Sequence, residues 1–327
     1  MKQIILLLLL LLSFITSCAE TEVWEEQKII YPAIAEVSDT IDRDVEYDTV
    51  VCSYEKYMDL KPVVYSAQGS ACYGDYLVQG YNYNSCVTIY NIKEKSCLGT
   101  IDIPAPAPSS KTHSNTLNFG GQRYDSNDYF PLLYVSSGYQ TKGVSHIYVY
   151  RLLKEERKGT DIFSISLVQT IFLHFNTWTE GIVDMASNNL WIKYAPNNSN
   201  GYACYKMPNV FDGDVDIYYE DYIKDFRLDR TPVGSRNQGH LFVDGKILFV
   251  TGVPSSGEEI AFISIDTEKK ERDLIIDLAE VGLVNPNNPK DNTFEPEGVI
   301  IYNDQLMICY RKAIYAFNIE RKKKEEL

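Results

Sequence analysis

Four segments of the chain share one layout, and this repeat constrains the fold more than any other feature of the sequence. Each segment starts with Gln or Glu followed by Gly, continues as a short apolar run, makes a tight polar turn and ends in a second apolar run. The segments start at Gln68-Gly69, Glu180-Gly181, Gln238-Gly239 and Glu297-Gly298. Their turns are Gly74-Asp75, Ser187-Asn188-Asn189, Asp244-Gly245 and Asn303-Asp304. Gly, Asn and Asp supply the positive φ that short hairpin turns need, so each segment predicts a β-hairpin.

The sequence after the hairpins repeats as well. Residues 87–103, 261–278 and 314–327 each read as a strand that ends in Asn or Asp and is followed by a Lys/Glu-rich turn. The whole unit is therefore a four-stranded antiparallel meander of roughly 40–60 residues, which is typical of a β-propeller blade. We predict an all-β protein with a single β-propeller. A β-sandwich with coincidental turns would explain alternating strands, but not the recurring Gln/Glu-Gly pair ahead of each turn.

The number of blades follows from one further unit. His113-Ser114-Asn115 stands where the Gln/Glu-Gly pair would be, and two apolar strands follow a polar insertion at 120–128. Blades then start near residues 68, 113, 180, 238 and 297. This gives five blades, with six as the alternative if residues 24–66 hold more than one pair of strands.

The last blade lacks an outer strand, because only a charged tail follows Ala313–Ile319. The strand-like segment Val45–Tyr54 belongs to no other blade. An exposed strand edge is a hazard that proteins cover. We therefore predict that this N-terminal strand pairs with the last blade and closes the ring.

The first eighteen residues, MKQIILLLLLLLSFITSC, read as a bacterial lipoprotein signal. The apolar run Ile4–Leu12 is shorter than the roughly 20 residues that a membrane-spanning helix needs, and it fits a secretory signal. It ends in Ile15-Thr16-Ser17-Cys18, which resembles a lipobox. We predict a signal peptide at 1–17, a lipidated Cys18 and tether at 18–44, and a propeller at 45–327. The alternative is an ordinary signal peptide with an incidental Cys18.

Charge and cysteine content bear on the partners of the protein and on its disulfide bonding. The net charge of −14 argues against a nucleic-acid partner, which needs a basic surface. The six other cysteines show no CxxC spacing; they are Cys52, Cys72, Cys86, Cys97, Cys204 and Cys309. We interpret most of them as small buried apolar residues, with disulfides as the alternative. Cys86 and Cys97 fall in one hairpin but are not expected to lie opposite each other.

Several segments resemble those of a known group of proteins. They are HSN (113–115), FPLLYVSS (130–137), QGHLFVDGKILFV (238–250) and EPEGVIIY (295–302). Together with the lipobox, they are similar to uncharacterised Bacteroidetes-type lipoproteins with a TolB-like or NHL-like propeller. The resemblance covers residues 18–327 and implies a propeller fold and a place in the cell envelope. It implies six blades where the repeat counts five, and it brings no catalytic residues.

The candidate site lies where the inner strands of the blades begin. The candidate ligand-binding residues are Gln68, His113, Asn115, Glu180, Gln238, Glu295 and Glu297. We expect them to ring the axis at the funnel mouth, with each following Gly allowing close backbone approach. The alternative is a structural role, because such side chains can form hydrogen bonds with neighbouring blades and fix the packing of the ring. His113 breaks the repeat and Glu295 duplicates it, so these two positions favour function.

The function predicted from these features is binding. We expect a binding or interaction module, lipid-anchored through Cys18 to a bacterial membrane, the outer one by preference, and periplasmic or surface-exposed. Its partner would be a glycan, peptide or protein at the funnel mouth. The alternative is a polysaccharide hydrolase or lyase, for which Glu180, Glu297 and His113 are the catalytic candidates. No hydrolase or nucleotide-binding motif is present, and we assign no cofactor and no metal site.

Overall fold

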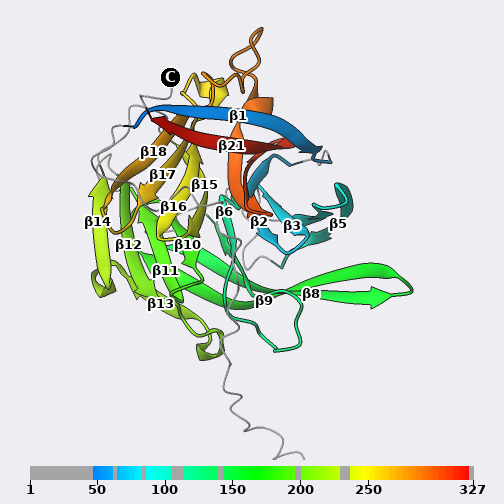
Figure 1. Ribbon diagram of the computed structural model, residues 1–327. Helices are drawn as coiled ribbons and strands as arrows, with labels where there is room; N and C mark the ends of the chain where they lie inside the picture. Colours follow the sequence, from blue (N-terminus) through cyan, green and yellow to red (C-terminus); the bar gives the residue numbers. More distant parts are fainter. Residues whose placement is uncertain are drawn as a thin grey trace, which may run out of the picture. The chain divides into compact units, whose positions relative to one another are not determined.

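The computed structural model describes residues 47–61, 65–82, 86–104, 113–137, 143–195, 200–228 and 236–323. These residues form five sheets that are the blades of a ring (Figure 1). The protein is a five-bladed β-propeller, as the repeat predicts, and six blades are not formed. The predicted signal peptide and tether lie outside the described residues.

Each blade runs from an inner to an outer strand, and blades 1 to 5 are numbered by the chain order of their inner strands. The inner strands are β2 (Ala67–Tyr73), β6 (Thr116–Phe119), β10 (Thr179–Asp184), β15 (Asn237–Val243) and β19 (Pro296–Tyr302). The second strands are β3 (Tyr76–Tyr81), β7 (Leu133–Ser136), β11 (Asn189–Tyr194), β16 (Lys246–Thr251) and β20 (Gln305–Tyr310). The third strands are β4 (Cys86–Asn91), β8 (Ser145–Arg157), β12 (Asn200–Lys206), β17 (Ala261–Asp266) and β21 (Ala313–Lys323). The fourth strands are β5 (Ser96–Asp102), β9 (Thr160–His174), β14 (Lys224–Leu228), β18 (Glu271–Asp277) and, in blade 5, β1 (Tyr47–Asp59).

The N-terminal strand closes the ring as predicted. β1 lies antiparallel to β21, with Cys52 opposite Ile319 and Tyr54 opposite Phe317. Figure 1 shows the two strands, blue and red, running side by side. The first described strand of the chain thus completes the blade that the last one leaves open. The strand continues to Asp59, beyond the predicted end at Tyr54.

Blade 2 departs from the predicted four strands. A fifth strand, β13 (Val215–Tyr218), pairs with β9 in parallel. It comes from the connection between the third and fourth strands of blade 3, so it ties the two blades together. The β8–β9 hairpin is also unusually long, pairing from Ser145 and Leu173 to Arg157 and Thr160.

The hydrophobic core is divided among the gaps between blades. Successive side chains of a strand point to opposite faces, so neighbouring residues of one strand belong to different interfaces. Ile182 packs with Ile247 of blade 4, whereas its neighbour Val183 packs with Ile147 of blade 2. Both faces of a blade are therefore covered, which explains the nearly continuous apolar runs of the repeat.

The six cysteines of the described residues form no disulfide bonds. Cys86, Cys204 and Cys309 are buried and the other three half-buried. Cys86 lies opposite Asp102 and Cys97 opposite Tyr90, so the two are not opposite each other.

Four short 3-10 turns complete the described structure. They are η1 (Val210–Asp212), η2 (Tyr219–Asp221), η3 (Pro254–Ser256) and η4 (Asn292–Phe294). None of the helical segments in the described part of the chain could cross a membrane.

Candidate functional site

The glycines of the repeat let the inner strands touch at the centre of the ring. The backbone N–H of Gly69 donates to the carbonyl of Ser114 at 2.8 Å, and that of Gly239 to the carbonyl of Asn115 at 3.2 Å. The second bond joins blade 4 to blade 2, which are not neighbours. A Cβ on Gly69 would lie 2.6 Å from the carbonyl oxygen of Asn115. The close backbone approach expected of these glycines is therefore present.

Three inner strands carry a shift in register at the repeated pair. The pairing of β2 skips between Ala67 and Ser70, that of β15 between Gln238 and His240, and that of β19 between Pro296 and Gly298. β10 pairs without a shift. A bulge turns a side chain away from the direction that regular pairing would give it. The repeated residues therefore do not form one ring but two clusters.

The first group, called here the glutamate–histidine cluster, joins blades 2, 3 and 4. It consists of Asn115, Thr116, Trp178, Glu180 and His240. The carboxylate of Glu180 accepts hydrogen bonds from Nδ1 of His240 at 2.9 Å, the Thr116 hydroxyl at 3.0 Å and the Trp178 indole N–H at 2.8 Å. Asn115 donates a longer one at 3.4 Å. Each oxygen of this fully buried carboxylate is thus satisfied from at least one side chain.

The protonation of this cluster follows from its contacts. Burial opposes the charge on Glu180, but the His240 ring, Lys193 and the Trp178 hydrogen bond outweigh it and hold the pKa of Glu180 well below its usual range. Burial also lowers the pKa of His240, against the attraction of Glu180. The pair is therefore an ionised carboxylate that accepts the Nδ1–H of a neutral imidazole.

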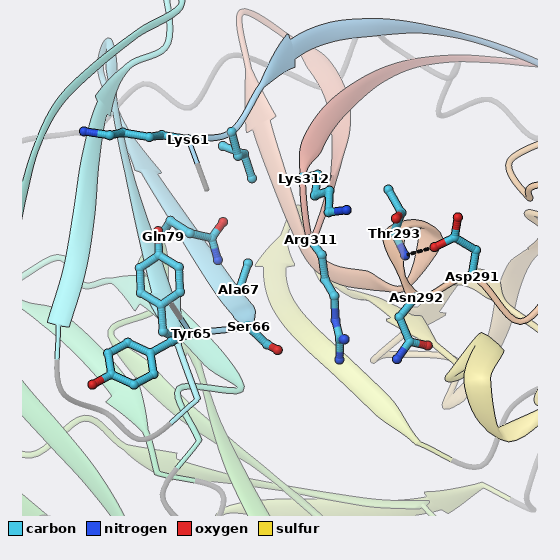
Figure 2. Close-up of a pocket in the computed structure, with 12 residues that line it drawn as sticks. Lys61, Tyr65, Ser66, Ala67, Gln79, Asp291, Asn292, Thr293, Arg311 and Lys312 are labelled. Carbon is cyan, nitrogen blue, oxygen red and sulfur yellow. Dashed lines mark hydrogen bonds between the residues drawn. The ribbon is translucent and has the colours of Figure 1, made fainter. Parts of the chain in front are cut away.

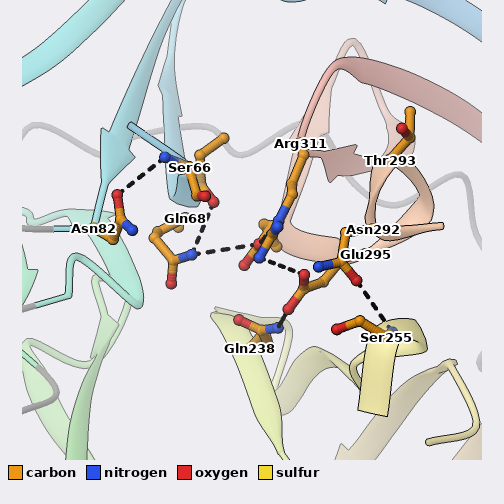
Figure 3. A network of polar contacts seen from close by, with 12 residues as sticks. Ser66, Gln68, Asn82, Gln238, Ser255, Asn292, Thr293, Glu295 and Arg311 are labelled. Carbon is orange, nitrogen blue, oxygen red and sulfur yellow. Dashed lines mark hydrogen bonds and ion pairs between the residues drawn. The ribbon is translucent and has the colours of Figure 1, made fainter. Parts of the chain in front are cut away.

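The second group, called here the arginine–glutamate cluster, joins blades 4, 5 and 1 (Figure 3). It consists of Gln68, Gln238, Glu295, Glu297 and Arg311. Arg311 Nε donates to Glu297 Oε1 at 2.9 Å, and its Nη2 lies 2.5 Å from Glu295 Oε2. Gln68 donates to Glu297 at 3.3 Å, and Gln238 to Glu295 at 3.1 Å. One guanidinium therefore holds two carboxyl groups together.

The arginine–glutamate cluster holds two carboxyl groups and one guanidinium, so the protonation state of each carboxyl group has to be assigned. Burial, followed by repulsion from Glu295, raises the pKa of Glu297 well above its usual value despite Arg311. Burial also raises the pKa of Glu295, opposed by Arg311 and the Gln238 hydrogen bond. The protonated form of Glu297 is therefore favoured, which leaves Glu295 as the charged partner of Arg311. The Arg311 guanidinium thus supplies the positive charge between the carboxyl oxygens of Glu295 and Glu297, in the place that a bound cation could take.

A cavity opens beside the arginine–glutamate cluster (Figure 2). Its volume is about 360 Å³. The residues that line it are Leu60, Lys61, Tyr65, Ser66, Ala67, Gln79, Tyr81, Asp291, Asn292, Thr293, Arg311 and Lys312. They come from blade 1, from the end of β1 and the β20–β21 turn in blade 5, and from the turn η4. We call it the mouth cavity, because it lies at the end of the ring where the inner strands begin.

Six of the seven predicted site residues fall in the two clusters. The exception is His113, which forms an isolated bridge with Asn82 ahead of β6. Its ring makes none of the hydrogen bonds of either cluster, and burial lowers its pKa. The predicted residues thus meet in two hydrogen-bonded clusters, with Glu180 in the first and Glu297 in the second.

Sequence reasoning missed Arg311, which organises the second cluster. Its signal was present in the turn Arg311-Lys312, which links β20 to β21. Because β20 runs antiparallel to β19, this turn returns to the end of the blade where β19 begins. A basic side chain there can reach the acids at the start of the inner strand.

The clusters bear on the predicted enzyme chemistry. A glycosidase needs two carboxyl groups that flank one substrate bond. Glu180 and Glu297 instead belong to different clusters, and each is tied by hydrogen bonds to another blade. Among the described residues, no group of three or more His, Cys, Asp or Glu is placed to hold a metal ion.

The sequence matches no protein-family model. It also matches no curated protein. The fold is similar to glutaminyl cyclase from Myxococcus xanthus, with a TM-score of 0.51 and 9% identity, over 84% of this chain and 100% of that one. Virginiamycin B lyase from Staphylococcus aureus gives a TM-score of 0.40 and 11% identity, over 83% and 99% of the two chains. A GH43 glycoside hydrolase gives 0.45 and 11%, over 84% and 53%. At these identities the likeness shows the propeller fold alone.

Proposed function

We propose that this protein is a binding module that holds a polar ligand in the mouth cavity. The observation that carries the proposal is the contrast between the cavity and the buried acids. The cavity is within the size range of small-molecule sites, and its lining includes polar side chains such as Arg311, Asn292 and Ser66. Glu180 and Glu297, by contrast, are committed to contacts between blades.

The N-terminal sequence supports a location for this module. Cleavage before Cys18 and acylation of its sulfur would anchor the propeller to a bacterial membrane, in the cell envelope. Two or three acyl chains give stable anchoring, since each buried CH₂ contributes about 0.8 kcal/mol. A glycan, peptide or protein of the envelope or the surroundings would then be within reach of the mouth cavity.

Ligand screening with paired variants tests the proposal. The full chain, purified from membranes in detergent, is screened against glycan and peptide arrays, and the affinity of each hit is measured. Tyr65→Ala removes a ring from the cavity, and Tyr222→Ala is its control, since the two residues are similarly exposed at 38% and 40%. We expect a loss of about tenfold, or 1.4 kcal/mol, for the first variant only.

Three results would contradict the proposal. The first is rapid conversion of a hit into products, which identifies an enzyme. The second is an equal loss of affinity in both variants, which places binding elsewhere. The third is the absence of any hit across both arrays.

A further inference from the structure

The hydrogen bonds of Arg311 leave part of its guanidinium available. Glu297 and Glu295 occupy Nε and Nη2, whereas Nη1 has no hydrogen-bond partner among the described residues. A guanidinium carries five N–H donors in a rigid fork. The side chain is 24% exposed and lines the mouth cavity, and Figure 2 shows it reaching between Ser66 and Asn292. The two acids therefore fix the fork in place while donors remain for a ligand.

Two acceptors of the cavity wall, on Asp291 and Asn292, already accept hydrogen bonds from the protein. Asp291 accepts from the backbone N–H of Thr293 at 2.9 Å and from the side chain of Asn285 at 3.1 Å. These hydrogen bonds lower the pKa of Asp291 to about 2, so it is ionised and satisfied. The carbonyl of the Asn292 side chain accepts from the backbone N–H of Ser255 at 3.1 Å.

The charged groups with hydrogen-bonding capacity left over are donors. Figure 2 shows Asn292 beside Arg311, and the ammonium group of Lys312 lies near enough to Asp291 to lower its pKa. A wall of unused donors binds a ligand rich in acceptors. A planar fork fits a carboxylate in particular, since two parallel hydrogen bonds can form.

The charge of the lining agrees with an anionic ligand. Arg311 and Lys312 stand against a single acid, Asp291, in the lining of the cavity, while the Lys61 side chain points away from them in Figure 2. The whole chain, by contrast, carries −14. Glu295 and Glu297 lie behind Arg311 and reduce the positive charge of the cavity. They do so by less than two charges, because the pKa of Glu297 is raised well above its usual value. The cavity is thus a local exception in an acidic protein.

We infer that the ligand of the mouth cavity is an acidic sugar whose carboxylate binds Arg311. The inference rests on the proposed function, because it names the ligand class of the same site. Asn292 and Ser66, which lie on either side of Arg311 in Figure 2, offer hydrogen bonds to ring hydroxyls. A carboxylate and hydroxyls on one compact ring satisfy these groups together.

Calorimetry with matched ligands tests the inference on the full chain in detergent. The pairs are tetragalacturonate with its carboxyl-reduced form, and sialyllactose with lactose; inorganic phosphate is the third probe. We expect at least one acid to bind ten times more tightly than its neutral counterpart, and to weaken as salt rises. Arg311→Lys keeps the charge but loses the fork, so it should weaken that acid about tenfold. Arg157→Lys, on the exposed tip of the β8–β9 hairpin, is the control.

Stability is measured with each variant, so that a folding defect is recognised. If Arg311→Lys unfolds, Lys312→Ala replaces it and should weaken the acid several-fold. Equal binding of acid and neutral members overturns the acidic-sugar inference and leaves the proposed function standing. Phosphate binding as tightly as the acids overturns it too, as a simple anion site. The proposed function itself would fail with a different result, in which no ligand of any class depends on the cavity for binding.

Discussion

At the scale of single residues, the inner strands show that buried charges hold the propeller together. Glu180 is the clearest case, because its carboxylate receives hydrogen bonds from blades 2, 3 and 4. Removing one member of such a buried set leaves the others unpaired, which costs more than the set itself contributes. The residue is therefore structural in the first place.

Replacing Glu180 tests this role. Glu180→Gln keeps the shape but turns an NH₂ group toward side chains that donate, and it removes the charge that Lys193 and His240 face. We expect a loss of about 3 kcal/mol in the free energy of unfolding, measured by urea denaturation. The exposed Glu268→Gln should stay within about 0.5 kcal/mol, and equal midpoints for both variants would contradict the account.

Replacing Glu297 should change the free energy of unfolding in the opposite direction. A carboxyl group whose pKa is raised by folding stabilises the native state below its unfolded pKa, and this contribution is lost as pH rises toward the folded pKa. Glu297→Gln lacks that dependence. The variant should therefore gain relative to the wild type between pH 5 and 8, by up to about 1.4 kcal/mol per pH unit.

Denaturation curves at several pH values measure this difference. Glu268→Gln serves again as the control and should parallel the wild type. A difference between Glu297→Gln and the wild type that stays constant across the pH range would show that Glu297 is ionised in the folded protein.

At the scale of elements, the hairpins could be predicted from the local chemistry of their turns. The features that depend on long-range strand pairing could not. The turn residues Asn188, Asp244 and Asn303 have positive φ as expected, and the inner strands start close to the predicted positions. Strand β13 was missed because Val215–Tyr218 is short, and its pairing depends on β9, about forty residues away. The bulges were missed for a similar reason, since they appear only when the partner strand is in place.

Gly239 tests the importance of close packing between inner strands. Its φ is +45°, and a Cβ there would lie 2.6 Å from the carbonyl oxygen of Glu297 and meet the backbone of Gly298. Gly239→Ala should cost more than about 2 kcal/mol, or prevent folding. Gly245→Ala is the matched control, because φ is +73° but nothing lies within 4 Å of the added atom; it should cost about 1 kcal/mol. Similar melting temperatures for the two variants would contradict tight packing at Gly239.

At the scale of the whole molecule, the ring is joined by apolar contacts between blades and by the pairing of β1 with β21. The repeat predicted both, because every blade shares one pattern and one blade lacks a strand. The proposed ligand site was less predictable. Gln68, Gln238, Glu295 and Glu297 were identified, but they surround Arg311 and do not line the cavity. Arg311 and the cavity depend on a turn brought to the mouth by the fold.

Membrane attachment also belongs to this scale. We expect the wild type to take up a labelled fatty acid in a bacterial host and to sediment with membranes. Cys18→Ser should lose both properties, whereas Cys97→Ser should keep them. Labelling that persists in Cys18→Ser would contradict lipidation at this residue.

The most direct test of the mouth cavity as the ligand site is a crystal structure with the tightest-binding acidic sugar. We expect the sugar in the cavity, with a carboxylate oxygen about 3 Å from the guanidinium of Arg311. A sugar bound on another face, with the cavity empty, would contradict this expectation.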